Sequence, residues 1–162
     1  MKKRWLLALV FTYLLFIPSL VFAVDFDILS YQGDLNIHAD NTAIFKETIT
    51  YRFGDDYNGQ LVGLGKAGKM PEGFDIDPDP TVQVSKNGRI VQNAPFYTME
   101  EEDGYKVKIY NAGYAGDTVR VTVTWKLTNL LFLYKDIAEL NWQPLTDSSE
   151  PIENFEFRVT GF

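Results

Sequence analysis

The chain has 162 residues, no cysteine and a formal net charge of −7 at pH 7. The lack of cysteine excludes disulfides, a thiolate nucleophile, cysteine zinc sites and iron–sulfur clusters. An acidic chain repels phosphates, so we do not expect nucleic acid as a partner. For the same reason, charge alone would not hold the protein on anionic lipid.

The first 23 residues have the three-part layout of a secretory signal peptide. Residues 2–4 are basic, residues 5–17 are apolar apart from Thr12, and the residues before position 24 suit cleavage after Ala23. The alternative is an uncleaved anchor, because residues 5–24 approach the length of a membrane span. Both readings export residues 24–162, whose formal net charge becomes −10 when the three basic residues are subtracted from −7.

Two strands are expected before residue 54. Residues 24–38 mix apolar and polar side chains, and Gly33-Asp34 interrupts the alternation as a β-bulge would. Residues 45–53 alternate regularly, with aromatic and aliphatic side chains on one face and mainly threonine and basic side chains on the other. This period of two predicts a half-buried strand.

Residues 54–73 carry six glycines and are the least regular part of the chain. We expect a long loop there, with one short strand near Leu61. Long loops in compact domains are often functional, so residues 54–80 form a candidate binding region.

The remaining chain is predicted to form short strands separated by turns, with Asn87-Gly88 as the strongest hairpin signal. No segment shows a sustained helical period, and residues 130–134 fit either a strand extension or a short helical turn. The pattern predicts one all-β domain over residues 24–162, an antiparallel β-sandwich with immunoglobulin-like general architecture, preceded by the N-terminal hydrophobic helix. The expected strands lie near residues 82–84, 90–91, 95–99, 105–110, 118–127, 138–142 and 155–159.

The order of motifs resembles a family of predicted bacterial membrane proteins of unknown function. The motifs are FKETITYRF at 45–53, GYKVKI at 104–109, TVRVTVTW at 118–125, YKDIAELNW at 134–142 and PIE at 151–153. In that family an exported β-rich N-terminal domain is followed by transmembrane segments and a Gly-rich tail. The resemblance covers nearly all of residues 24–162 and implies no catalytic residues.

Two features depart from the family pattern. The family usually has Gly followed closely by an aromatic residue and Arg after the Phe-rich strand, and residues 59–62 lack both. The sequence also stops at Phe162, directly after an apolar strand and without the family's downstream spans, so two alternatives stay open: a fragment of a longer protein or a short family member. Membrane association would then come from those spans or from the N-terminal segment.

Asp75, Asp77 and Asp79 could supply oxygen ligands to calcium. The EF-hand pattern requires Gly where Pro80 stands and Glu where Lys86 stands, so only a looser calcium site is possible. The alternative is a solvated Asp/Pro turn. These three carboxylates are the candidate metal ligands.

Glu47 shares the apolar face of its strand with Phe45, Ile49 and Tyr51. A buried carboxylate needs a partner, such as Arg, or a raised pKa. The alternative is a carboxylate at the rim or in a structural pair.

Tyr110 and Tyr114 flank a turn and are expected to be exposed, which makes them candidate binding residues. No nucleophile elbow, phosphate loop or dinucleotide fingerprint is present, so we expect neither an enzyme nor a cofactor. The expected function is an exported, non-catalytic interaction or sensing module at the cell surface, with an unknown protein or a cell-wall glycan as partner. A carbohydrate- or calcium-binding domain is the alternative, and a cell-wall hydrolase comes third.

Overall fold

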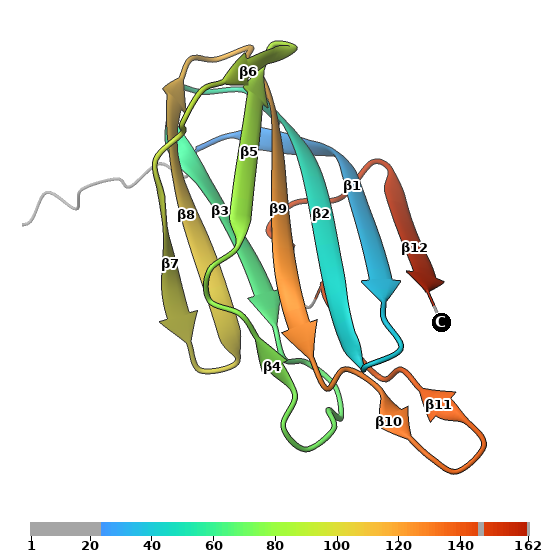
Figure 1. Ribbon diagram of the computed structural model, residues 1–162. Coiled ribbons are helices and arrows are strands. Elements are labelled where there is room, and N and C mark those ends of the chain that lie inside the picture. The colour runs from blue at the N-terminus through green and yellow to red at the C-terminus, as the bar shows by residue number, and fades with distance from the viewer. Residues whose placement is uncertain (1–23, 146–147, 162) are drawn as a thin grey trace, which may run out of the picture.

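The computed structural model describes residues 24–145 and 148–161, so the expected signal or anchor lies outside the described residues. The described chain is all-β, as predicted (Figure 1). Over these ranges no helix is long and apolar enough to cross a membrane. In chain order the strands are β1 (Phe26–Ile37), β2 (Thr42–Phe53), β3 (Tyr57–Gly65), β4 (Asp75–Ile76), β5 (Thr81–Lys86), β6 (Arg89–Val91), β7 (Phe96–Glu101), β8 (Gly104–Gly113), β9 (Thr118–Thr128), β10 (Phe132–Leu133), β11 (Ala138–Glu139) and β12 (Phe155–Gly161).

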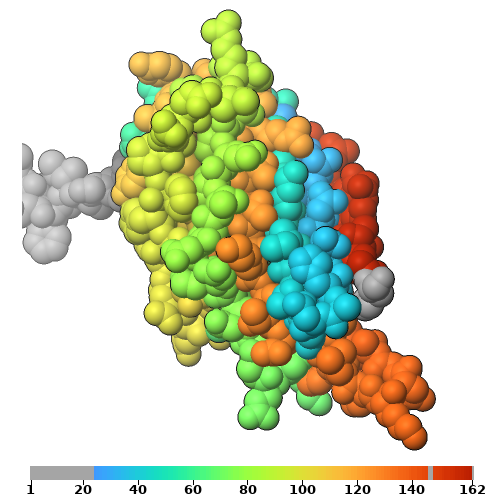
Figure 2. Space-filling model, viewed as in Figure 1, coloured from blue at the N-terminus to red at the C-terminus, as the bar shows by residue number. Residues whose placement is uncertain are grey.

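Two sheets face each other and form the predicted sandwich (Figure 1). The large sheet has the order β12-β1-β2-β9-β5-β6, and β4 also pairs with β9. The small sheet has the order β3-β8-β7. Strands β10 and β11 form a separate hairpin that projects from one end of the molecule (Figure 2).

Strands β2 and β9 form the centre of the large sheet. They pair antiparallel, with Phe45 opposite Trp125 and Ile49 opposite Val121. All four side chains are buried, whereas Lys46 on the other face is exposed. Apolar burial drives this arrangement, and the strands predicted over residues 45–53 and 118–127 are confirmed.

The short strand expected near Leu61 is present but longer than predicted, because residues 57–65 form strand β3, and the predicted long loop is wrong for this part of the glycine-rich stretch. Val62 and Leu64 are buried from this strand, and it pairs with β8 over most of its length. Glycines weaken strand propensity, so the pairing and the two buried side chains outweigh the local preference.

The bulge predicted at Gly33-Asp34 is also wrong. Gly33 pairs regularly with Glu47, and the register of β1 shifts instead between Ile28 and Ser30. Gly33 is required for space, because a Cβ there would lie 2.6 Å from the ring of Phe157. The glycine therefore marks close packing on the sheet face and not a break in the strand.

Strand β12 makes the large sheet mixed, since it pairs parallel with β1 and places Phe155 beside Tyr31. Strands β9 and β12 both run in the direction of β1, so the chain needs a long crossover between them, and residues 129–154 provide it. The strand predicted over residues 138–142 is reduced to β11, and residues 132–133 form β10, its partner in the hairpin. The sandwich prediction holds, and β12 is the departure from its antiparallel pattern.

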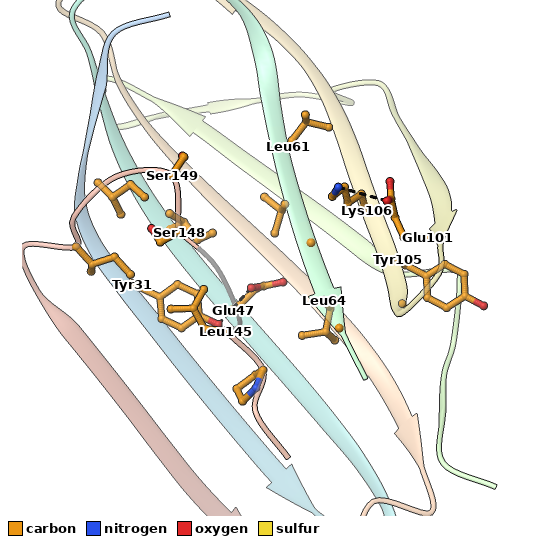
Figure 3. Close-up of a pocket in the computed structure, with 18 of the residues that line it drawn as sticks. Tyr31, Glu47, Leu61, Leu64, Glu101, Tyr105, Lys106, Leu145, Ser148 and Ser149 are labelled. Carbon is orange, nitrogen blue, oxygen red and sulfur yellow. Dashed lines mark hydrogen bonds and ion pairs between the residues drawn. The ribbon is translucent and has the colours of Figure 1, made fainter. Parts of the chain in front are cut away.

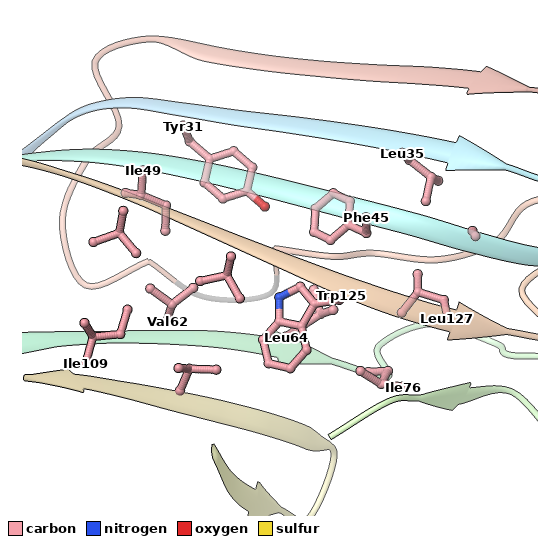
Figure 4. Packing of buried hydrophobic residues seen from close by; sticks show 14 of the residues in the cluster. Tyr31, Leu35, Phe45, Ile49, Val62, Leu64, Ile76, Ile109, Trp125 and Leu127 are labelled. Atoms are coloured by element: carbon pink, nitrogen blue, oxygen red, sulfur yellow. The ribbon is translucent and has the colours of Figure 1, made fainter. Parts of the chain in front are cut away.

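The core lies between the two sheets (Figure 4). Trp125, Tyr31 and Phe45 are the largest fully buried side chains, and all three come from the large sheet. Val62 and Leu64 of β3 and Ile109 of β8 face them from the small sheet.

Candidate functional site

A groove runs along β3, between this strand and the inner face of β1 and β2. It consists of two cavities of about 500 Å³ and 480 Å³. One cavity follows β3 from Leu61 to Gly65, and the other follows it from Tyr57 to Leu61. Because Phe26 and Tyr51 line both cavities, we treat them as one feature, the β3 groove. Figure 3 shows the cavity that follows Leu61 to Gly65.

The groove exists because the sheets differ in width. Three strands of the small sheet cannot cover a path of six strands in the large sheet. The inner face of β1 and β2 therefore extends beyond β3. The connection between β11 and β12 covers part of it, and Trp142, Leu145 and Ile152 pack there against the core.

Glu47 lies in the wall of the groove (Figure 3). Strand alternation points its side chain inward, where only 2% of the residue is exposed. Trp125 Nε1 donates a hydrogen bond to Glu47 Oε1 at 2.8 Å, and the Tyr31 hydroxyl donates to Oε2 at 3.3 Å. The structural-pairing alternative for Glu47 is thereby observed, with tryptophan and tyrosine as partners in place of the suggested arginine.

Burial changes the acidity of this cluster. Desolvation raises the pKa of Glu47 to about 7, although the hydrogen bonds from Trp125 and Tyr31 oppose the shift. Burial, followed by the nearby Glu47 carboxylate, also raises the pKa values of Tyr31 and Tyr51 above their ordinary value. Near neutral pH, Glu47 is therefore the group of this cluster that exchanges a proton.

One end of the groove is acidic. Glu101, Glu102 and Asp103 line the cavity where β7 turns into β8. Lys106 lies in the same wall, and its Nζ is 3.4 Å from Glu101 Oε2. Together with Glu47, the described lining of this cavity holds four carboxyl groups and one lysine, which favours basic groups over acidic ones.

The three predicted calcium ligands lie on and after β4, outside the groove. Lys66 Nζ is 3.2 Å from Asp75 Oδ1, and Lys126 Nζ is 3.8 Å from Asp77 Oδ2. Asp77 Oδ1 also accepts a hydrogen bond from the backbone N–H of Asp79. Within residues 24–145 and 148–161, no three His, Asp or Glu side chains gather closely enough to hold a metal ion. The calcium site stays a prediction without structural support.

Tyr110 and Tyr114 are exposed, as predicted, at 45% and 74%. The ring of Tyr110 lies 5.9 Å from that of Tyr97, and Lys108 Nζ is 5.3 Å from the Tyr110 ring centroid. Tyr110 also lines the second cavity of the groove. Tyr114 lies in the turn after β8, so the structure gives the two predicted binding residues different surroundings.

Sequence reasoning expected a short strand near Leu61 but missed the full length of β3, and it missed the partners of Glu47. The alternation of Gln60, Val62 and Leu64 was a signal for the strand, but the intervening glycines hid it. Nothing local in the sequence pairs Glu47 with Trp125 or Tyr31, because those contacts depend on the register between strands.

Comparisons with known proteins give one clear match. The family model described as "Predicted membrane protein (DUF2207) N-terminal domain" matches residues 27–161. No curated protein matches.

Solved structures show a weak likeness. The M1 zinc metallopeptidase from Deinococcus radiodurans is 16% identical, with a TM-score of 0.42, over 84% of this chain and 32% of that one. Native yeast LTA4 hydrolase is 15% identical, with a TM-score of 0.40, over 65% of this chain and 15% of that one. The chain thus spans a third or less of these structures, and at such TM-scores they support no statement about function.

Proposed function

The chain belongs to the family of predicted membrane proteins that share the DUF2207 N-terminal domain, and on that premise we propose that it is a non-catalytic recognition domain. It is exported and stays associated with the outer face of the cell membrane. Its β3 groove is the surface that receives a partner. The domain thereby serves as an interaction or sensing module.

The observation that carries this proposal is the β3 groove itself. It combines two adjoining cavities of about 500 Å³ and 480 Å³. Binding sites are typically concave, largely apolar and furnished with a few polar groups. Here Phe26 and Tyr51 supply apolar surface, and the residues of the β7–β8 turn supply the charges.

The surroundings of Glu47 support a non-catalytic role. A raised pKa is a property of general acids, and burial raises the pKa of Glu47 to about 7. Both of its oxygens, however, already accept hydrogen bonds from Trp125 and Tyr31. The carboxyl thus joins β1, β2 and β9, which is a structural task.

Export rests on residues 1–23, with their basic start and apolar run. A fusion of alkaline phosphatase after Phe162 tests it, because that enzyme needs an oxidising, non-cytoplasmic compartment for its disulfides. We expect high phosphatase activity and little activity from a matched cytoplasmic reporter. The reverse pattern would reject the outer location.

Recognition through the groove is tested by photo-crosslinking in cells. A photo-crosslinking amino acid replaces Leu61 in the groove wall, and in a control it replaces Ile90 of β6. Both positions are well exposed, at 58% and 75%. We expect a discrete adduct from position 61 alone. Equal labelling from both positions, or none from position 61 at normal protein levels, would contradict the proposal.

A glycan is the second candidate partner, favoured by the exposed pair of Tyr97 and Tyr110, whose rings lie 5.9 Å apart. Aromatic faces bind groups that present both apolar and polar atoms. The change Tyr110→Ala should abolish binding to cell-wall glycan fragments in calorimetry, while Tyr114→Ala serves as the control. Unchanged binding by Tyr110→Ala would remove this candidate.

A further inference from the structure

We propose that the β3 groove takes an extended, basic segment of a partner protein, which pairs with β3 as a fourth strand of the small sheet. The inference rests on the proposed recognition function and specifies the form and charge of the partner. Its basis is the unpaired edge of β3, the groove that follows this edge, and the carboxylates at one end.

The direction of the β3 backbone groups follows from the pairing with β8. Antiparallel pairs alternate between residues that exchange hydrogen bonds and residues whose N–H and C=O point away from the partner. The Lys66 N–H donates to Asp103 O just beyond β3. Given the observed register, the backbone N–H and C=O groups of Val62 and Leu64 bond to β8. The backbone groups of Leu61 and Gly63 point away from β8, towards the free edge of β3.

Strand β8 gives the same answer independently. Tyr110 N–H donates to Pro95 O on the side of β7. Residues of β8 alternate between their two neighbours, so Ile109 and Val107 bond to β3, and their partners are Gln60 and Val62. In the described part of the chain, β3 has no strand on its other side. Among the described residues, no backbone hydrogen bond outside the strand ladders uses Leu61 or Gly63, which leaves their outward groups for pairing.

One contact already uses this edge. Trp142 Nε1 donates to the carbonyl oxygen of Gly65 at 3.0 Å. Gly65 belongs to the same alternating set as Leu61 and Gly63, so this bond shows an outward carbonyl accepting a donor from outside the sheet. From Gly65 back to Tyr57, the same edge of β3 lines the two cavities of the groove.

The groove has the direction that an added strand requires. Its two cavities follow β3 from end to end, and a neighbouring strand would lie about 4.8 Å away in the sheet. Alternate side chains of that strand would face Ile49 and Tyr51 on the large sheet, which favours apolar residues. Main-chain bonds supply affinity and alternate side chains supply specificity in this mode of recognition.

Charge selects a basic segment. The described lining of the cavity beside the β7–β8 turn holds Glu47, Glu101, Glu102 and Asp103, with Lys106 as the basic group among these described residues. Lys108 lines the other cavity. A basic side chain of the partner is therefore favoured at the end near Asp103.

The test uses the full-length chain in detergent and the change Leu61→Pro. Proline removes an outward N–H, and its ring blocks a neighbouring strand, while the β3–β8 ladder does not use that N–H. Thr98→Pro is the matched control, since the same register analysis places Thr98 N–H on the free edge of β7. Leu61→Ala removes most of the side chain and keeps the backbone N–H, so it separates the contribution of the side chain to binding from that of the backbone.

The probe is a capped heptapeptide of alternating valine and lysine, measured by calorimetry and by amide hydrogen exchange. We expect binding that weakens at least about tenfold in Leu61→Pro and is unchanged in Thr98→Pro and Leu61→Ala. In the wild-type chain, peptide should slow exchange at the amides of Leu61 and Gly63. A valine–glutamate peptide should bind at least about tenfold more weakly.

Two results would overturn strand addition. The first is no binding of the valine–lysine peptide at a peptide concentration of about 1 mM. The second is binding without protection of Leu61 and Gly63, a readout that does not depend on the folding of any variant. A crosslink from position 61 in cells, combined with either result, would keep the recognition function and reject the strand. Loss of both the crosslink and peptide binding would reject the two together.

Discussion

The two halves of the large sheet bury their inner faces in different ways. On the half formed by β9 the small sheet lies directly above, and Val119, Val121, Val123, Trp125 and Leu127 are fully buried. On the half formed by β1 and β2 the small sheet ends, and a groove with a buried carboxyl takes its place. The inner face of β9, which the small sheet covers, is thus purely apolar. Beside the edge of the small sheet, the inner face of β1 and β2 leaves room for polar groups and for a partner.

Glu47 stands at the boundary between these halves. Its oxygens accept from Trp125 on the covered side and from Tyr31 on the open side. The bond to Tyr31 links the core to β1, which the small sheet does not cover. The following predictions test this contrast.

The largest effect is expected from Trp125→Ala in the covered half. Removal of this fully buried side chain leaves a cavity and takes a donor from Glu47, so the free energy of unfolding should fall by about 3–5 kcal/mol. Tyr134→Ala in the hairpin is the control, because that aromatic side chain is exposed. Denaturant titration measures both, and a loss below about 1 kcal/mol in Trp125→Ala would show that the covered half is not the stable one.

The second effect is a pH dependence that Glu47→Gln should remove. The pKa of Glu47 is raised from 4.5 to about 7 in the folded chain, so the folded state holds the proton more tightly. Its stabilising contribution is complete below pH 4.5 and is lost as pH rises through about 7, a change on the order of 3 kcal/mol. Glu47→Gln keeps an acceptor for Trp125 and should be more stable than wild type at pH 8.

Unfolding measured between pH 4.5 and 8 in both proteins decides this point. The remaining carboxylates are common to the two chains, so the difference between the curves isolates Glu47. Parallel curves would mean that the carboxyl is ionised throughout and would contradict its desolvation.

A smaller effect is expected at the turns that close the covered half. Asp117 accepts hydrogen bonds from Tyr57 Oη, Asn87 Nδ2 and the Tyr114 N–H, and these bonds lower its pKa. Asp117→Ala should cost about 1 kcal/mol at neutral pH. Because a lowered pKa stabilises the folded state only above the ordinary pKa, the cost should shrink as pH falls below 3.8. Asp136→Ala in the hairpin is the control, and an equal cost in both would refute the role of the turn network.

The smallest effect is expected from Asp27→Asn on the outside of the open half. Arg52 and Asp27 form an ion pair of 2.7 Å, but both side chains are more than half exposed. Solvent screens such pairs, so thermal unfolding should change little at low salt and not at all at high salt. A loss that persists in high salt would show that the open half depends on this surface pair.

Local pattern predicted most strands, because period-two alternation records which side of a strand is buried. Residues 45–53 and 118–127 alternate regularly, and both lie in strands of the central pair. The prediction fell short at β3, where only a short strand was expected, and it failed at Gly33, because glycine interrupts the pattern in both places. In both places glycine allows close packing or pairing, and the contacts that use it come from distant residues.

The candidate site was predictable only in part. The inward position of Glu47 and the exposure of Tyr110 and Tyr114 followed from alternation and turn position. The partners of Glu47 did not, because Trp125 is 78 residues away in sequence. The acidic stretch at the β7–β8 turn was visible in sequence, but its place at the end of a groove was not.

The sequence by itself determined an all-β chain with no cysteine chemistry and a strongly apolar start, since composition and alternation are local properties. The tertiary structure alone decided that the second sheet has three strands, that β12 returns parallel to β1, and that a groove opens beside β3. Sheet width and strand order depend on which segments pair across long separations. That choice is made by the summed burial and backbone bonding of the whole domain.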